Sequence, residues 1–140
     1  MKNLRSLLFA LTVLLMATAA QAQQTSLKAN VPFDFVVADH DYPAGEYTLQ
    51  SMLNSGLVIR IKNIREASPG IALSSECSSR EPSATTKLVF HRLGDRYFLY
   101  QVWIEGNSSG RQFRMSNTEI QLAQNKQRTE LVIVAANLSH

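Results

Sequence analysis

The chain has 140 residues, of which 45% are hydrophobic, a length and composition that suit one domain with a single core. Its formal net charge is +3, but the basic residues are scattered rather than gathered in a dense run, so nucleic acid is not an expected partner. The only cysteine, Cys77, excludes an internal disulfide. We interpret it as a buried small side chain, with intermolecular pairing or a reactive thiol as alternatives.

The chain begins with the pattern of a secretory signal peptide. Lys2 and Arg5 precede an apolar run from Leu7 to Ala19, and Ala20-Gln21-Ala22 follows, with small residues at positions −3 and −1 of the expected cleavage site. The run is shorter than the roughly 20 residues that span a bilayer. We therefore predict a signal peptide over residues 1–22.

Cleavage after Ala22 leaves residues 23–140, which we expect to form a single β-rich domain without a transmembrane segment. It also removes two basic residues, so that twelve basic residues remain against eleven acidic ones. We expect a secreted protein that resides in the periplasm.

Apolar residues recur with a period of two after the signal peptide, between short clusters of Gly, Pro, Asn, Asp and Ser. This alternation predicts strands over residues 31–37, 46–50, 57–62 and 71–77. Pro32 cannot donate to a sheet ladder, so we place the first strand at a sheet edge, available for strand addition by a partner. We interpret residues 38–45 as a loop.

The strongest local pattern spans residues 87–106, where Gly94-Asp95 separates two apolar runs and suits a two-residue hairpin turn. The resulting register pairs Leu93 with Arg96, Arg92 with Tyr97, His91 with Phe98, Phe90 with Leu99, Val89 with Tyr100 and Leu88 with Gln101. Both faces of this hairpin are too apolar for open solvent. Each face must therefore pack against another part of the protein.

One cover is the single helix that the sequence predicts, over residues 117–126. Ser116 is its expected N-cap, and Glu119 at the third position completes a capping box. A last strand over residues 130–136 is apolar on both faces, so we place it centrally in the sheet.

About seven strands and one short helix near the C-terminus, without βαβ alternation, predict an all-β fold. The strands should be mainly antiparallel and form a sandwich or a partly open barrel.

The predicted hairpin carries the candidate ligand-binding residues. Its register places Arg92, Tyr97 and Trp103 on one face, where aromatic rings beside a guanidinium suit a sugar, lipid or peptide. The same side chains are equally compatible with a core layer. His91, on the opposite face, is the fourth candidate.

Metal and catalytic motifs are missing from the sequence. Asp39-His40-Asp41 is the one dense cluster of potential metal ligands, but adjacent residues rarely converge on one ion, so we interpret it as a solvated turn and predict no metal site. No nucleophile elbow, phosphate loop or zinc motif is present, so we predict no catalytic residue and no cofactor. The alternative is a hydrolase that uses His91 with a spatially adjacent carboxylate.

Three stretches form a recognisable set, namely Val-Pro-Phe-Asp-Phe (31–35) with Pro-Ala-Gly-Glu-Tyr-Thr (43–48), Lys-Leu-Val-Phe-His-Arg (87–92) with Gly-Asp-Arg-Tyr-Phe-Leu (94–99), and Trp103. This set resembles a group of small secreted bacterial proteins, common in acidobacterial lineages, that have no assigned function. The resemblance implies bacterial origin and secretion, and it supplies no activity, cofactor or site residue. The Asp39-His40-Asp41-Tyr42 segment departs from the pattern of that group.

These observations favour a small periplasmic β-domain with a non-catalytic role. That role is either binding, with an unknown ligand or envelope protein as partner, or envelope structure. The sequence does not indicate an oligomeric state.

Overall fold

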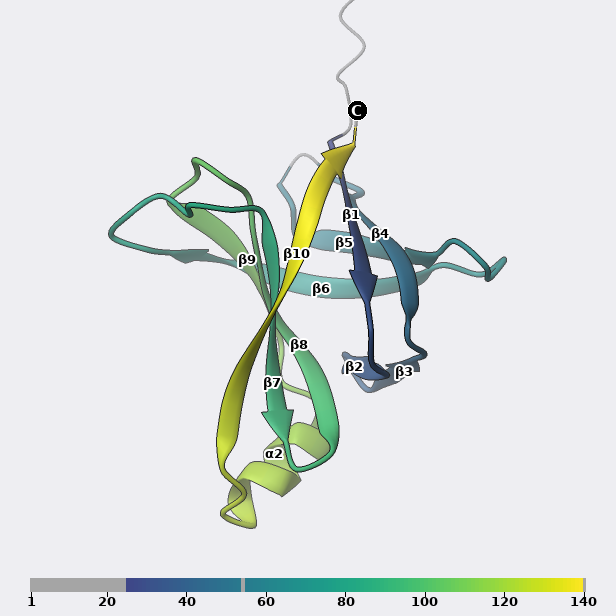
Figure 1. Ribbon diagram of the computed structural model, residues 1–140, viewed down its shortest axis with the longest axis vertical. Coiled ribbons are helices and arrows are strands. Elements are labelled where there is room, and N and C mark those ends of the chain that lie inside the picture. The colour runs from purple at the N-terminus through teal and green to yellow at the C-terminus, as the bar shows by residue number, and fades with distance from the viewer. Residues whose placement is uncertain (1–24, 54, 140) are drawn as a thin grey trace, which may run out of the picture.

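Ten strands of one sheet and a single helix make up the part of the protein that the computed structural model describes, residues 25–53 and 55–139 (Figure 1). The predicted signal peptide lies outside these residues. The elements are β1 (Ser26–Val31), β2 (Phe35–Val37), β3 (His40–Tyr42), β4 (Gly45–Ser51), β5 (Val58–Asn63), β6 (Gly70–Ser78), β7 (Lys87–Leu93), β8 (Arg96–Trp103), β9 (Ser109–Phe113), α2 (Asn117–Gln124) and β10 (Thr129–Ser139).

The sheet closes on itself. Its strand order is β3-β2-β8-β7-β10-β1-β4-β5-β6-β9, and β9 pairs again with β8, which joins eight strands into a closed barrel. All pairings are antiparallel except that of β2 with β8. The predicted all-β, mainly antiparallel fold with one short helix is confirmed, and the barrel is the architecture that forms.

The segment interpreted as a loop over residues 38–45 contains the strand β3, which pairs with β2 in a hairpin, so that prediction was wrong at His40–Tyr42. Its tight turn has positive φ angles at Ala38 (49°) and Asp39 (66°), as a type I′ hairpin turn requires. Because neither residue is glycine, the sequence carried no strong turn signal there. This hairpin adds to β8 through β2, where Phe35 pairs with Tyr97.

The predicted edge strand over residues 31–37 was also wrong. The chain breaks into β1 and β2 around Pro32, where no ladder hydrogen bond is needed. β1 pairs with both β10 and β4, and β2 pairs with both β8 and β3, so neither presents a free edge. The side chains of Val31, Phe35 and Val37 are buried in the core, and Phe33 packs against it partly buried.

The register of the β7–β8 hairpin follows the prediction from the turn as far as the pair of Phe90 with Leu99. A β-bulge then shifts it by one residue, so that Leu88 pairs with Val102 rather than Gln101. The extra residue on β8 is Tyr100, which pairs with no residue of β7. Beyond the bulge each side chain of β8 lies on the face opposite to the predicted one.

β9 was not predicted as a strand, because its Ser109-Gly110 start has low strand propensity. The close packing of Trp103 explains why position 110 is a glycine. A Cβ on Gly110 would lie 2.8 Å from ring atoms of Trp103, so only glycine lets the indole pack against this backbone.

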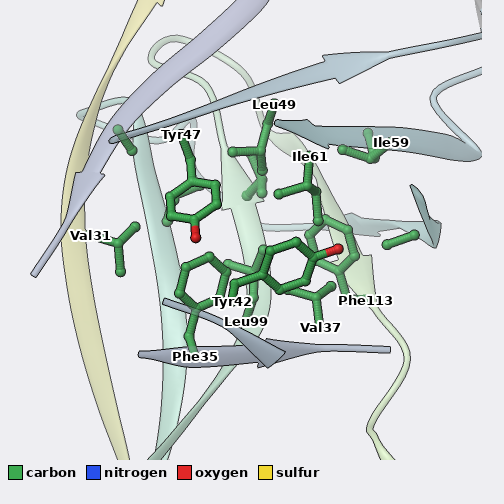
Figure 2. Close-up of a cluster of buried hydrophobic side chains, with 14 of the residues drawn as sticks. Val31, Phe35, Val37, Tyr42, Tyr47, Leu49, Ile59, Ile61, Leu99 and Phe113 are labelled. Carbon is green, nitrogen blue, oxygen red and sulfur yellow. The ribbon is translucent and has the colours of Figure 1, made fainter. Parts of the chain in front are cut away.

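One end of the barrel is closed by aromatic rings beside β2 and β3 (Figure 2). Phe35 stacks on Tyr42 with ring centroids 5.3 Å apart and meets Tyr47 edge-on at 5.0 Å. The Tyr47 hydroxyl donates to the carbonyl of Pro43 (2.6 Å) and accepts from Asn63 Nδ2 (3.1 Å). The buried hydroxyl is therefore satisfied, and the rings fill this end of the barrel.

The helix covers part of the outer face of the barrel, as expected. Ser116 is its N-cap, and its Oγ accepts from the backbone N–H of Glu119 (3.1 Å). Leu122 packs against a small cluster made of Val36, Leu93 and Phe98. No helix among the described residues is long and apolar enough to cross a membrane.

β10 lies centrally between β7 and β1, as predicted, but only one of its faces is covered. Leu131 and Ile133 are 66% and 61% exposed on the outside of the barrel. The apolar side chains on the outer face of this strand are therefore exposed to solvent.

Closure of the barrel by aromatic rings makes stability sensitive to alkaline pH. Burial, and secondarily the charge of Glu66, raises the pKa of Tyr42 above 10.0, and burial likewise raises the pKa of Tyr47. An unfolded tyrosine loses its proton near pH 10, while the folded protein keeps it, so the free energy of unfolding falls as pH rises above about 10.

We therefore expect Tyr42→Phe to make this alkaline fall shallower in urea unfolding measured between about pH 9 and pH 11. Tyr100→Phe is the control, because its ring stacks on His91 rather than in the aromatic cluster. Equal slopes for Tyr42→Phe and the parent protein would contradict the assignment.

Candidate functional site

The end of the barrel opposite the β2–β3 hairpin contains a hollow of about 320 Å³. β1 runs from this hollow at Leu27 to the closed end at Val31. Leu138 of β10 and Gly56, between β4 and β5, also line the hollow, and the end of β10 lies beside the start of β1 (Figure 1). The apolar lining of the hollow consists of Leu27, Leu49, Ile59, Val102, Ile104 and Leu138.

The apolar lining follows from the alternation of the strands. Leu27, Leu49 and Ile59 are inward-facing residues of β1, β4 and β5, and all three are buried in the core. Val102 joins them because the bulge at Tyr100 turns this part of β8 inward. Prediction from the unbulged register missed that contribution.

A single charged side chain, Arg111 of β9, lines the same hollow. Its Nε donates to Ser74 Oγ (3.1 Å) and its Nη2 donates to the Ser74 carbonyl (3.1 Å). The Ser74 hydroxyl donates in turn to the Gly56 carbonyl (2.7 Å). These bonds fix the plane of the guanidinium.

Gly56 is required at this place for two reasons. Its φ of +66° suits glycine, and a Cβ there would lie 3.2 Å from Arg111 Nε. Arg111 therefore packs directly against the β4–β5 turn.

The charge of Arg111 is not balanced by an ion pair. Within the described ranges no carboxylate oxygen lies within 4.0 Å of its guanidinium, although Glu76 is its partner in the β6–β9 register. The hollow thus combines an apolar wall with one oriented, unpaired cation.

The four ligand-binding candidates from the sequence do not form one surface. Arg92 and Tyr97 do come together, since the guanidinium carbon lies 5.7 Å from the ring centroid. Phe33 stacks on the same ring, with ring centroids 3.8 Å apart. Arg92 Nε also donates to the Gly94 carbonyl (3.0 Å), so the arrangement is a packed stack at the end of the hairpin.

Trp103 lies apart from that stack. The bulge moves it to the outer face of the barrel, where it is 8% exposed and packs over Gly110. Its Nε1 donates to Gln101 Oε1 (3.0 Å), and Gln101 Nε2 donates to Gln112 Oε1 (3.0 Å). The indole therefore covers the junction between β8 and β9.

His91 has an acidic neighbour, Glu119, whose side chain was predicted to complete the capping box of the helix. Its Nδ1 lies 2.6 Å from Glu119 Oε1, and its ring stacks on Tyr100 with centroids 3.9 Å apart. The Glu119 backbone N–H donates to the N-cap residue Ser116, while its carboxylate binds His91. The predicted capping box is therefore only half formed, because the Glu119 side chain points to His91 rather than back to Ser116. The histidine thereby ties the helix to the barrel.

The two carboxylates of the Asp39-His40-Asp41 segment bind other residues of the protein. Asp39 accepts hydrogen bonds from the backbone N–H (2.7 Å) and from Nδ2 (3.2 Å) of Asn117, at the start of α2. Asp41 forms an ion pair with Arg96 (2.9 Å). Each carboxylate thus supports a neighbouring element.

Cys77 is half-buried rather than fully buried. The alternation along β6 places it on the outer face of the strand, with Ile71 and Leu73. Burial raises the pKa of its thiol, which favours the protonated form and lowers its reactivity.

No family model, curated protein or solved structure was found to match this chain. Function is therefore argued from the hollow at the open end. Three hydroxyl side chains, those of Thr25, Ser51 and Ser55, line it beside Arg111. The contact that orients Arg111 joins residues 37 positions apart, and the sequence offered no reason to place Arg111 beside Ser74.

The contact between His91 and Glu119 predicts a stability effect. Glu119→Ala removes the acceptor of a mostly buried imidazole, because the two side chains are 15% and 4% exposed. We expect a loss of about 1–3 kcal/mol in urea unfolding. Gln121→Ala, an exposed position on the same helix, is the control and should change stability little. Similar effects of both variants would show that the pair does not hold the helix.

Proposed function

We propose that this protein is a non-catalytic binding protein that takes a small, mainly apolar molecule into the open end of its barrel. The observation that carries the proposal is the apolar hollow, whose volume of about 320 Å³ is near the lower end of the range of roughly 300–1,000 Å³ for ligand sites. Mouths of small barrels are common places for such sites.

The physical reason for binding is the burial of apolar surface. Each square ångström of apolar ligand surface removed from water contributes roughly 25 cal/mol. The wall belongs to paired strands, so little ordering of the protein is needed on binding.

We also propose that the protein is exported to the periplasm, in keeping with the signal-peptide pattern over residues 1–22 and the resemblance to small secreted bacterial proteins. Mass spectrometry of the protein from a periplasmic extract should give a chain that begins at Gln23. A chain that retains Met1 would contradict export by this route.

A hydrolase is the second candidate function, favoured by the distance of 2.6 Å between His91 and Glu119. The low exposure of both side chains leaves little room for a substrate, so we prefer the binding role. The hydrolase alternative requires turnover of an ester, glycoside or peptide that is lost in a folded His91→Ala variant.

The binding role predicts that an uncharged fluorescent probe, N-phenyl-1-naphthylamine, gains fluorescence with the purified protein. Ile104→Trp narrows the hollow and should weaken probe binding by about tenfold, the effect of roughly 1.4 kcal/mol of lost contact. Ile133→Trp makes the same change on the outer face of β10 and should leave probe binding unchanged. Equal effects of the two variants would mean that the probe binds elsewhere.

A further inference from the structure

We propose that the ligand is an amphipathic acid whose carboxylate binds Arg111 while its apolar chain lies along Leu27, Leu49 and Leu138. This inference rests on the proposed binding function and names the chemical class of its ligand.

The first support is the position of the guanidinium. Arg111 lines the hollow together with six apolar side chains, so a molecule in the hollow meets both. A wholly apolar molecule leaves that charge without a partner and removes water from it, which is costly. A molecule with an anionic end and an apolar body satisfies both parts of the lining.

The second support is the orientation of the guanidinium. Ser74 accepts from Nε and Nη2, and Ser74 is itself buried and bonded to Gly56. No hydrogen bond between described residues involves Nη1, so donors remain for a ligand. A planar donor group held in place loses little entropy when it binds a carboxylate.

The third support is the charge balance of the site. No carboxylate of the described residues forms an ion pair with Arg111, whereas Arg92 and Arg96 each have an acidic partner. Arg111 is also set among apolar side chains, where an ion pair with a ligand is screened less than at the surface. An anion is therefore the ligand group that the site is missing.

The test compares octanoate, 1-octanol and octylamine as competitors of the uncharged naphthylamine probe on the full protein. The three competitors share one alkyl chain and differ in the charge of the head group. We expect octanoate to bind roughly 10- to 100-fold more tightly than octanol, the effect of charge-assisted hydrogen bonds, and octylamine to bind most weakly. The preference for octanoate should shrink as the salt concentration rises.

The matched variants are Arg111→Gln and Arg111→Lys. Arg111→Gln should abolish the preference for octanoate over octanol, measured as the ratio of the two affinities for the same variant, and Arg111→Lys should retain part of it. Because Arg111 also bonds to Ser74, the circular dichroism spectrum and urea unfolding of each variant serve as the check on folding. The comparison of octanoate with octanol on the parent protein needs no variant.

Each outcome decides the inference. A preference for octanoate that disappears in Arg111→Gln supports it. Equal affinity for octanoate and octanol, or a preference that survives in Arg111→Gln, overturns the acid class while probe binding preserves the proposed function. Failure of the parent protein to bind the probe or any competitor overturns both this inference and the proposed binding function. If an alkyl phosphate binds more tightly than octanoate, the head group that the site prefers is a phosphate rather than a carboxylate, and the inference as stated is overturned.

Discussion

The architecture depends on the pairing of β8 with β9, which closes the barrel over only two residue pairs, Gln101 with Gln112 and Val102 with Arg111. Without it both strands would expose unpaired edges. The junction is reinforced by the side-chain bond between the two glutamines and by the indole of Trp103 above Gly110. The other part of the same edge of β8 pairs with β2, so one strand joins the barrel wall to the hairpin that closes it.

The bulge in β8 determines which chemistry faces inward. With one extra residue at Tyr100, Val102 turns toward the hollow and Trp103 turns outward to cover the junction. Trp103 therefore does not join Arg92 and Tyr97, with which the predicted register grouped it. Val102 instead adds an aliphatic side chain to the lining of the hollow. A single inserted residue thus accounts both for the separation of the predicted site and for part of the apolar wall.

The parts of the fold that depend on neighbours in sequence were predictable. The Gly94-Asp95 turn, the strands of alternating residues and the N-cap at Ser116 follow from local preferences. The β2–β3 turn, the bulge and β9 did not follow, because distant contacts stabilise them against weak local signals. Arg111 looked like one of many scattered cations until closure of the sheet placed it beside Ser74 and the apolar wall. Likewise, local reasoning placed Glu119 in the helix cap and missed its carboxylate contact with His91, 28 positions away.

The contact of Asp39 with the first residue of α2 links two elements that are 78 positions apart in the chain. A movement of the β2–β3 hairpin away from the barrel would break this contact with the helix, so the contact helps to keep the hairpin in place at the closed end. For the proposed ligand, Gly56 and Leu138 at the edge of the hollow are then the residues expected to affect its association and its residence time.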